Sequence, residues 1–394
     1  MDERSCTGSY VLEKNLNMIA IATHAALYNE GALHGPADAI SEFLTAHNVS
    51  HLILYHPLAG RYSSWLVQRQ NGQEIRKSIG PAWTGAKRYP LDVLLTIKAL
   101  WSSAPGVVIC VDPLNGIAGL VLKLFRRTRT VVYFSVDYAQ QRFSNTLLNW
   151  IYHFCDRLCV RYADYCWGVS RRIVAVRLRQ GVTNERNIHI PNAPAFNRIP
   201  RPGTPHNPYE LILVSDLQAG IAFRELFEAL RELIPKYPQL SLTIIGGGEG
   251  EKEVRAEIVA LQLEEKVHIL GKLPHRTVHE ILGRAGIGIA LYTDEAPWRY
   301  YSDPMKVRDY LACGLPVILS GDLDLGEELV QAGAGIVVEP NTSSIVGVIE
   351  TLLANHDQYK TYHKNALTLA DRYDLDKILT VAFRNIGVAV PTKL

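Results

Sequence analysis

The chain has 394 residues, of which 47% are hydrophobic, 20% charged and 9% aromatic. This composition supplies enough apolar side chains for large cores and excludes a wholly disordered chain, and the length predicts two domains. The net charge of +2 conceals an uneven distribution. Residues 1–200 carry 22 Lys and Arg against 13 Asp and Glu (+9), whereas residues 201–394 carry 19 Lys and Arg against 26 Asp and Glu (−7). This asymmetry predicts that the two halves bind different partners.

Residues 1–16 are polar and acidic, which predicts an N-terminal tail rather than a signal peptide. After this tail, strands alternate with helices. The predicted strands are short apolar runs over residues 17–22, 51–55, 106–111, 130–134, 165–169 and 187–190. Five helices are predicted between them: one that begins at Pro36, one over residues 91–101, one that ends at Phe125, one over residues 145–162 and one in the basic stretch that follows residue 169. Residues 60–89 lack a clean periodicity and predict neither helix nor strand.

The long helix over residues 145–162 is predicted to be amphipathic. Its apolar side, which we expect to be buried, consists of Leu148, Ile151, Cys155, Leu158 and Cys159. Cys155, Cys159 and His153 have no matching ligands nearby in the sequence, so we expect a buried helix face there and no bound metal. The six cysteines of the chain show no paired spacings, which favours reduced thiols and a cytoplasmic location.

Residues 192–208 contain five prolines, which excludes a helix or a central strand and predicts a linker between domains. The alternation resumes beyond it. The predicted strands of the second half span residues 210–214, 241–245, 267–270, 287–292, 316–319 and 335–338. Helices separate them, and two more finish the chain. This order predicts an α/β protein with two Rossmann-like, doubly wound parallel-sheet domains that face a cleft, over residues 17–200 and 209–372. We expect residues 373–394 to form a C-terminal helix that crosses back to the first domain.

One helix of the second half has well-defined ends. Ser302 or Asp303 can cap its N-terminus, and Pro304 suits the first helical position. At the other end, Gly314 can adopt a left-handed turn, and Pro316 prevents the helix from continuing. The helix follows the strand over residues 287–292, so its free N–H groups are expected at the edge of the sheet where ligands bind.

Lys306 and Asp309 lie on one face of this helix. A helix N-terminus favours an anion, and Lys306 would add a full positive charge beside it. Asp309 can accept hydrogen bonds from vicinal hydroxyls such as those of a ribose. Together they suggest a nucleoside diphosphate. The alternative is a surface ion pair worth a few tenths of a kcal/mol on an ordinary capped helix.

This segment resembles the nucleotide-sugar motif of GT-B glycosyltransferases, especially the retaining family 4 (glycosyl transferases group 1). In that family a proline, a lysine and an acid precede a Tyr-Met/Leu-Ala-x-Gly-x-Pro-Val run. The matching residues here are Pro304, Lys306, Asp309 and residues 310–317. Further similar stretches follow in the family's order, at residues 163–164, 169–170, 190–193, 242–248 and 267–271. The resemblance covers roughly residues 17–385.

The resemblance implies a retaining, metal-independent hexosyltransferase of polysaccharide biosynthesis that needs no cofactor. The donor would be a UDP- or GDP-sugar, and the acceptor a glycan, a lipid-linked group or a small molecule. It implies catalytic roles for Lys306, Arg224 and Asp137, of which the two cations would stabilise the leaving diphosphate. The residues expected to bind the nucleotide sugar are Asp309, Ser302, Asp303, Pro304, Gly246, Gly247, Gly248 and Ser215.

The chain departs from the family's pattern at several positions. The first of the two usual glutamates falls at Tyr301, and the second is Asp309. The usual basic pair on the β-phosphate is absent, so Arg224 is the only nearby candidate. Of a His-Asp pair in the N-terminal domain only Asp137 is kept. These departures leave two alternatives: a GT-B-fold sugar-nucleotide epimerase, and a non-catalytic, glycosyltransferase-like binding protein.

Glycines mark two further loops. Residues 246–250 follow a strand, but a dinucleotide fingerprint would need glycine at position 251, which is Glu251. They suit either a close approach to a nucleotide or a flexible turn. On the acceptor side, Gly31 and Gly35 would let a ligand approach the backbone. We also assign His34 (or His24) and Asp112 to that side, although Asp112 can equally be a helix cap.

Basic residues cluster in the first half, with Trp150, Tyr152 and Trp167 nearby. The clusters comprise Lys123, Arg126, Arg127, Arg129, Arg171, Arg172, Arg177 and Arg179. They suit an anionic lipid surface, or equally a solvated face. No apolar run reaches the ~20 residues of a spanning helix, so we expect at most a peripheral contact with the inner face of the membrane. No nucleic-acid-binding motif accompanies the charge, and we expect no nucleic-acid partner.

Overall fold

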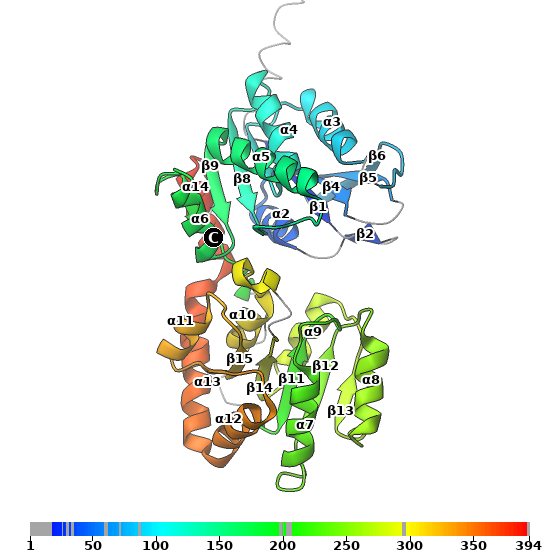
Figure 1. Cartoon of the computed structure of the whole chain (residues 1–394). Coiled ribbons are helices and arrows are strands. Elements are labelled where there is room, and N and C mark those ends of the chain that lie inside the picture. The colour runs from blue at the N-terminus through cyan, green and yellow to red at the C-terminus, as the bar shows by residue number, and fades with distance from the viewer. Residues whose placement is uncertain are drawn as a thin grey trace, which may run out of the picture. The chain divides into compact units, whose positions relative to one another are not determined.

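The computed structural model describes residues 18–25, 27–28, 31–32, 35–58, 62–70, 72–85, 88–196, 199, 201, 207–293 and 297–391. The chain divides into two compact units, residues 1–190 with 379–394 and residues 191–378 (Figure 1). The division falls before the proline-rich stretch, and the last residues of the C-terminal helix belong to the first unit. Each unit is a sheet covered by helices.

The first unit contains an eight-stranded sheet in the order β10-β9-β8-β7-β1-β4-β5-β6. Its strands are β1 (Ile19–Ala25), β4 (His51–Pro57), β5 (Ser64–Gln70), β6 (Gln73–Ile79), β7 (Val107–Cys110), β8 (Thr130–Ser135), β9 (Tyr165–Gly168) and β10 (Asn187–His189). A separate ribbon pairs β2 (Leu27–Tyr28) with β3 (Gly31–Ala32). The helices of the unit are α2 (Pro36–Ala46), α3 (Arg88–Trp101), α4 (Pro113–Leu124), α5 (Thr146–Tyr162) and α6 (Arg171–Arg179).

An antiparallel hairpin, β5–β6, occupies the stretch for which the sequence predicts neither helix nor strand. It extends a sheet that is otherwise parallel. Every residue of β6 before Ile79 is exposed, so this strand shows no apolar alternation. Gly72 adopts a φ of +76° at the turn, a left-handed conformation that suits a tight hairpin.

The second unit contains a six-stranded, entirely parallel sheet in the order β13-β12-β11-β14-β15-β16. Its strands are β11 (Glu210–Val214), β12 (Ser241–Ile245), β13 (Val267–Ile269), β14 (Ile287–Ala290), β15 (Val317–Ser320) and β16 (Gly335–Val338). Its helices are α7 (Phe223–Leu233), α8 (Glu251–Ala260), α9 (His275–Leu282), α10 (Met305–Ala312), α11 (Gly326–Gln331), α12 (Thr342–Ala354), α13 (His356–Ala370) and the start of α14 (Leu375–Asn385), with 3-10 turns at Pro297–Tyr301 and Asp371–Tyr373.

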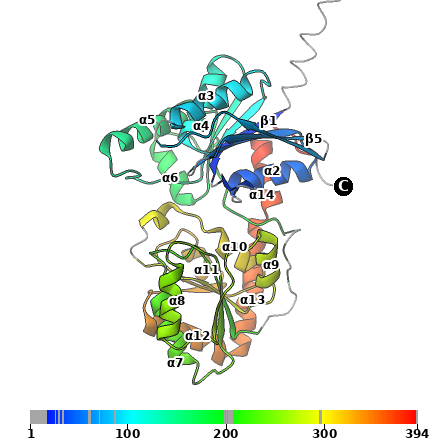
Figure 2. The ribbon, with the colours of Figure 1, turned by 90° about the vertical axis from the view of Figure 1, so that its right-hand side faces the viewer.

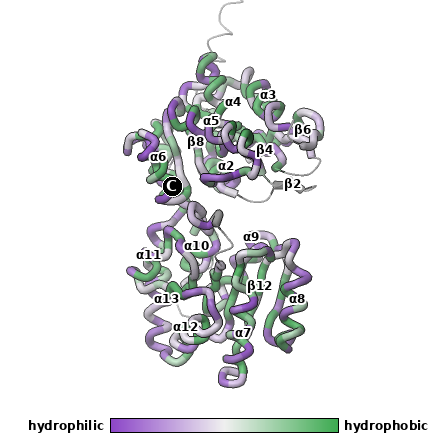
Figure 3. Tube along the Cα trace, viewed as in Figure 1, coloured by the Kyte–Doolittle hydropathy of each residue, from purple (hydrophilic) through white to green (hydrophobic). Residues whose placement is uncertain are grey.

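Helices lie on both faces of this sheet, with α8 on one side and α9 on the other (Figure 2). Hydrophilic and hydrophobic residues alternate along α8, as expected for a surface helix with one buried side (Figure 3). The strand order reverses at β11, because the chain first adds β12 and β13 on one side and then returns to β14 on the other. In a doubly wound sheet, ligands bind beyond the carboxyl ends of the strands at this point.

A fully buried ion pair fastens two helices of the first unit to its sheet. Arg177 of α6 donates to both carboxylate oxygens of Asp156 in α5, at 2.7 and 2.8 Å, and to the Ser135 hydroxyl at the end of β8, at 2.5 Å. Tyr133 of β8 donates to Asp156 at 2.6 Å. Arg177 is therefore not part of the basic surface that the sequence suggests. Trp167, expected at the same surface, is also fully buried.

Candidate functional site

The site in the second unit forms where β11 and β14 lie side by side. Tyr310 of α10 fixes the helix to both strands: its hydroxyl donates to the Ile289 carbonyl at 3.2 Å and accepts from the Val214 N–H at 2.8 Å. Gly288 makes room for this ring, since a Cβ there would lie 2.4 Å from Tyr310 Cδ2. Tyr310 thereby holds α10 beside β11 and β14, where the strand order of the sheet reverses.

The N-terminus of α10 differs from the prediction. Pro304 is the N-cap residue, the helix begins at Met305, and no side chain caps it. Ser302, one of the two expected caps, donates instead to the Arg299 carbonyl at 2.9 Å. The C-terminus agrees with the prediction, because Gly314 has a left-handed φ of +75°. The first turn of α10 thus keeps N–H groups without a side-chain acceptor, which suits an anion.

Lys306 lies in this first turn, partly buried. Its Nζ is 5.1 Å from the ring centroid of Tyr292, which follows β14. Burial lowers the pKa of Lys306 to about 8, and the charge of Asp216, which follows β11, acts in the opposite direction. An anion bound beside Lys306 would favour its charged form further.

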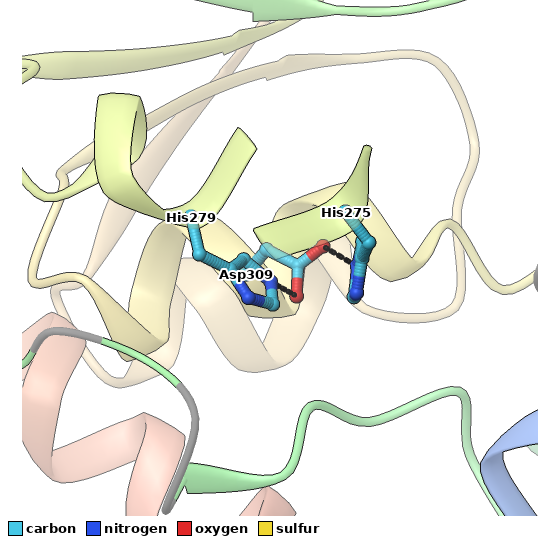
Figure 4. A group of neighbouring side chains, drawn as sticks. All are labelled: His275, His279 and Asp309. Atoms are coloured by element: carbon cyan, nitrogen blue, oxygen red, sulfur yellow. Dashed lines mark hydrogen bonds and ion pairs between the residues drawn. The ribbon is translucent and has the colours of Figure 1, made fainter. Parts of the chain in front are cut away.

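Asp309 is buried one turn further along α10, between two histidines of α9 (Figure 4). His279 Nε2 lies 3.2 Å from Oδ1, and His275 Nε2 lies 3.8 Å from Oδ2. Burial alone would raise the pKa of Asp309, but the neighbouring imidazoles of His275 and His279 hold it below its ordinary value. Asp309 is therefore ionised at neutral pH and accepts hydrogen bonds.

The same three side chains could hold a metal ion, since their ligand atoms lie within 4.8 Å of one another. Two imidazoles and one carboxylate suit zinc or iron(II). Sequence reasoning singled out neither His275 nor His279. The available signal was their spacing, because histidines four residues apart share one face of a helix.

Asp303, predicted to bind the nucleotide, is engaged within the unit. Its carboxylate accepts hydrogen bonds from the Arg308 guanidinium and, at 2.7 Å, from the Asn192 N–H. Arg308 also donates to the Asn192 carbonyl at 3.2 Å. Because both carboxylate oxygens are occupied by partners in the chain, Asp303 anchors residue 192 to α10.

The glycines after β12 meet the chain itself. A Cβ at Gly246 would lie 1.8 Å from the Ser215 carbonyl oxygen, and one at Gly248 would lie 2.6 Å from that of Leu217. At Gly247 the nearest atom would be 3.4 Å away, an ordinary contact. The close approach of the loop after β11 therefore requires glycine at positions 246 and 248. In the same loop, the Ser215 N–H donates a hydrogen bond to the Ile245 carbonyl at 3.0 Å.

The other two predicted catalytic residues each form an ion pair of their own. Arg224 starts α7 with its side chain 73% exposed and pairs with Glu228 at 3.3 Å. Asp137 follows β8 in the first unit and pairs with Arg142.

The predicted acceptor-side residues belong to the first unit. Gly31 pairs with Tyr28 in the β2–β3 ribbon, Gly35 caps α2, and His34 lies outside the described residues. Asp112 caps α4, accepting from the N–H groups of Leu114 and Asn115 at 2.9 and 3.0 Å.

A buried charge network surrounds Asp112 at the carboxyl ends of β1 and β7. His24 Nδ1 lies 2.8 Å from Asp112 and its Nε2 lies 3.3 Å from Asp92 of α3. Burial opposes the charge of His24, but Asp112 and Asp92 outweigh it and raise the pKa of His24 to about 9. Since both nitrogens of His24 and both oxygens of Asp112 have partners, this network stabilises the unit rather than offering a free base.

Because of the charge network around His24, we expect the free energy of unfolding to decrease as the pH becomes alkaline. The pKa of His24 rises from 6.5 to about 9 on folding, so its contribution is complete below pH 6.5 and is lost as the pH rises through 9. We expect the unfolding free energy to fall by about 3 kcal/mol across that window. Urea unfolding at several pH values measures this fall, and His24→Gln should remove it. An equal fall in the variant would contradict the assignment.

Residues 197–368 match the family model described as Glycosyl transferases group 1, which confirms the resemblance for the second unit. Among curated proteins, a human subunit of phosphatidylinositol N-acetylglucosaminyltransferase is 30% identical over 176 residues. The aligned part is 44% of this chain and 34% of the relative, so the chain spans about a third of the length of that relative.

Solved structures resemble the chain over most of its length. HepE from Anabaena, in complex with UDP, has a TM-score of 0.69 at 16% identity and covers 94% of this chain and 99% of its own. Sucrose-phosphate synthase from Thermosynechococcus elongatus has a TM-score of 0.66 at 14% identity, with the same coverages. A Listeria monocytogenes protein assigned as a UDP-N-acetylglucosamine 2-epimerase has a TM-score of 0.58 at 13% identity and covers 96% and 99%. At these identities the likeness establishes the fold, and the predicted GT-B architecture is confirmed.

Proposed function

We propose that the chain is a retaining glycosyltransferase that moves a sugar from a nucleoside-diphosphate sugar to an acceptor. The observation that carries the proposal is the start of α10: no side chain caps it, Lys306 lies in its first turn, and Asp309 lies one turn further along. This arrangement occurs in the unit where the strand order reverses, inside the segment that matches Glycosyl transferases group 1.

In the proposed complex, the diphosphate lies against the first N–H groups of α10. Lys306 and the helix dipole stabilise the negative charge that develops on the leaving diphosphate. Asp309 accepts hydrogen bonds from the ribose. The tight loops after β11 and β12 form the surface for the base. Arg224 is proposed to stabilise the leaving diphosphate with Lys306, and Asp137 is proposed as a further catalytic residue, as the resemblance implies.

The partners are proposed from the similar proteins. HepE was solved with UDP and with UDP-glucose, which supports UDP as the nucleotide, with GDP as the alternative. The name of the human relative includes phosphatidylinositol, which supports a lipid-linked acceptor among the glycan, lipid-linked and small-molecule classes. Retention, a hexosyl donor and a metal-independent reaction follow the family resemblance.

The experiment follows the fate of the donor. UDP- and GDP-sugars are screened by thermal shift, because a bound ligand raises the apparent stability. The best donor is then incubated with lipid-linked and soluble glycan acceptors, with and without EDTA. Release of nucleoside diphosphate and a product of unchanged anomeric configuration are expected. Donor binding without release, under every acceptor condition, would favour a non-catalytic binding protein.

A sugar-nucleotide epimerase is the second candidate, because the Listeria protein shares the fold over 96% of this chain. An epimerase needs no acceptor. Incubation with the donor alone distinguishes the two, since an isomerised sugar nucleotide in the absence of acceptor would contradict the transferase proposal.

Replacing Asp309 with alanine is expected to weaken UDP binding by roughly tenfold or more, because hydrogen bonds to a charged group are worth about 1.5–3 kcal/mol. Calorimetry measures the affinity. Asp357→Ala is the matched control, since that carboxylate is 93% exposed on α13. Unchanged affinity in Asp309→Ala would exclude the ribose role. A loss of affinity on adding EDTA to the wild-type chain would instead assign His275, His279 and Asp309 to a metal ion.

A further inference from the structure

Helix α5 exposes the N-terminal part of the side that its periodicity predicts to be buried, although Cys159 near its C-terminus is buried as predicted. Leu148 and Ile151 are both exposed, and the only buried residues of the helix are Asp156, Cys159 and Val160. One buried face would be expected for a helix on a sheet. An apolar face turned to solvent as well requires a separate explanation.

The exposed apolar residues form one stripe, which we call the α5 ridge: Leu147, Trp150, Ile151 and Phe154. Their spacing of three, four and seven residues places them on one side of the helix. Their exposed fractions are 65, 56, 41 and 43%. The rings of Trp150 and Phe154 stack with centroids 5.4 Å apart and planes 10° apart, so they present one flat apolar surface.

Two arginines follow the α5 ridge on the same side of the helix. Arg157 and Arg161 are exposed and follow the ridge at the same helical spacing. The single acidic residue of α5 is Asp156, which is buried against Arg177. The exposed face of α5 therefore combines an apolar ridge with positive charge and contains no carboxylate.

The end of α4 lies beside the C-terminal end of α5 and also exposes apolar side chains. Leu124 is 77% exposed, Phe125 is also exposed, and Arg126 follows them. Lys123 joins the two helix ends, because its Nζ lies 3.3 Å from the Tyr162 carbonyl of α5 and 2.6 Å from Asp164. The neighbouring carboxylate of Asp164 is thus neutralised by Lys123. The helices α4 and α5 pack against each other (Figure 1).

We propose that this face of the first unit, the α5 ridge with the end of α4, docks onto a membrane surface that contains anionic lipids. The ridge would enter the boundary between headgroups and acyl chains, as in amphipathic helices that lie in the plane of a bilayer. Arg157, Arg161 and Arg126 would contact the lipid phosphates. Aromatic side chains are favoured at this depth.

Charge selects the lipid surface over a second copy of the chain. In a symmetric dimer through this face, each copy would present arginines and no carboxylate of α4 or α5 to pair with them. An anionic lipid surface supplies the missing charge. Among the described residues, no helix is long and apolar enough to cross a bilayer, so the contact is with the surface. The inference is independent of the proposed sugar transfer.

Vesicle co-sedimentation with the full chain tests the proposal. Binding to vesicles of 70% phosphatidylcholine and 30% phosphatidylglycerol should exceed binding to pure phosphatidylcholine by tenfold or more, and should fall as salt is added. The double variant Trp150→Gln/Phe154→Gln should lose binding by tenfold or more. Arg157→Glu/Arg161→Glu should remove the preference for anionic vesicles.

Matched controls separate docking from general hydrophobicity. Ile75→Gln on β6 and Val259→Gln on α8 remove side chains that are 62 and 58% exposed, and both should bind vesicles like the wild-type chain. Circular dichroism and thermal melts confirm that each variant is folded. The proposal is overturned if the wild-type chain shows no preference for anionic vesicles, or if the folded ridge variant binds as well as the controls. A dimer in sedimentation that the ridge variant abolishes, without any vesicle binding, would assign the face to self-association instead.

Discussion

Replacing Lys306 with alanine is expected to lower kcat for sugar transfer by about 100-fold or more while the fold is retained. Lys306 is the cation in the first turn of α10, beside the N–H groups that no side chain caps. Removing one preorganised donor to a developing negative charge costs about 2.7–4 kcal/mol of barrier. Steady-state kinetics measure the loss. Lys252→Ala, on an exposed position of α8, serves as the control, and full activity in Lys306→Ala would contradict the proposed site.

The pH profile adds a second measurement on the same residue. The pKa of Lys306 is about 8, so the free protein carries this charge below pH 8 and loses it above. We expect kcat/KM to decline above pH 8, since this parameter reports groups of the free enzyme. Lys306→Arg keeps its charge throughout the range, so its profile should lack this decline whatever its absolute activity. An identical decline in both proteins would assign the ionisation to another group.

Replacing Asp156 with alanine is expected to destabilise the first unit by about 3–5 kcal/mol. The change leaves the guanidinium of Arg177 fully buried without its carboxylate, and it also removes the acceptor of the Tyr133 hydroxyl. Urea unfolding followed by circular dichroism measures the loss.

The double variant Asp156→Leu/Arg177→Met tests the physical reason. Removing both charges costs less than removing one, because no buried ion is left uncompensated. Arg276→Ala breaks an ion pair whose side chains are 89 and 57% exposed, so it should change stability by at most about 0.5 kcal/mol. A cost below 1 kcal/mol for Asp156→Ala would show that Arg177 finds another acceptor.

The strands of the second unit could be predicted from the sequence, because strands of a parallel sheet are buried on both faces and therefore form short continuous apolar runs. The residues predicted for β11, β12 and β16 are those the structure assigns. The β5–β6 hairpin was missed because β6 is exposed on both faces before Ile79 and therefore shows no regular apolar alternation. For α5, the period predicted an amphipathic helix and Cys159 is buried as predicted, but Leu148 and Ile151 are exposed, since the α5 ridge is itself apolar.

In the candidate site, too, some residues could be predicted from the sequence and others could not. Lys306 and Asp309 could be found because the ends of α10 are marked by local residues, proline before and glycine after. His275 and His279 could not, because they reach Asp309 only once the sheet order brings α9 beside α10. The hydrogen bonds of Asp303 could not be predicted either, because one of its partners, Asn192, lies more than a hundred positions away in the chain.

The two hydrogen bonds of Tyr310 bear on how a site of this kind can diversify. Its hydroxyl bridges Val214 and Ile289, which belong to the two strands that flank the reversal of the sheet. The helix that carries Lys306 and Asp309 is therefore built into the sheet as a fixed part. The loops that follow β11 and β12 are not bound in this way to α10. Substitutions in those loops can then alter base and sugar preference without moving the half of the site proposed for the phosphates.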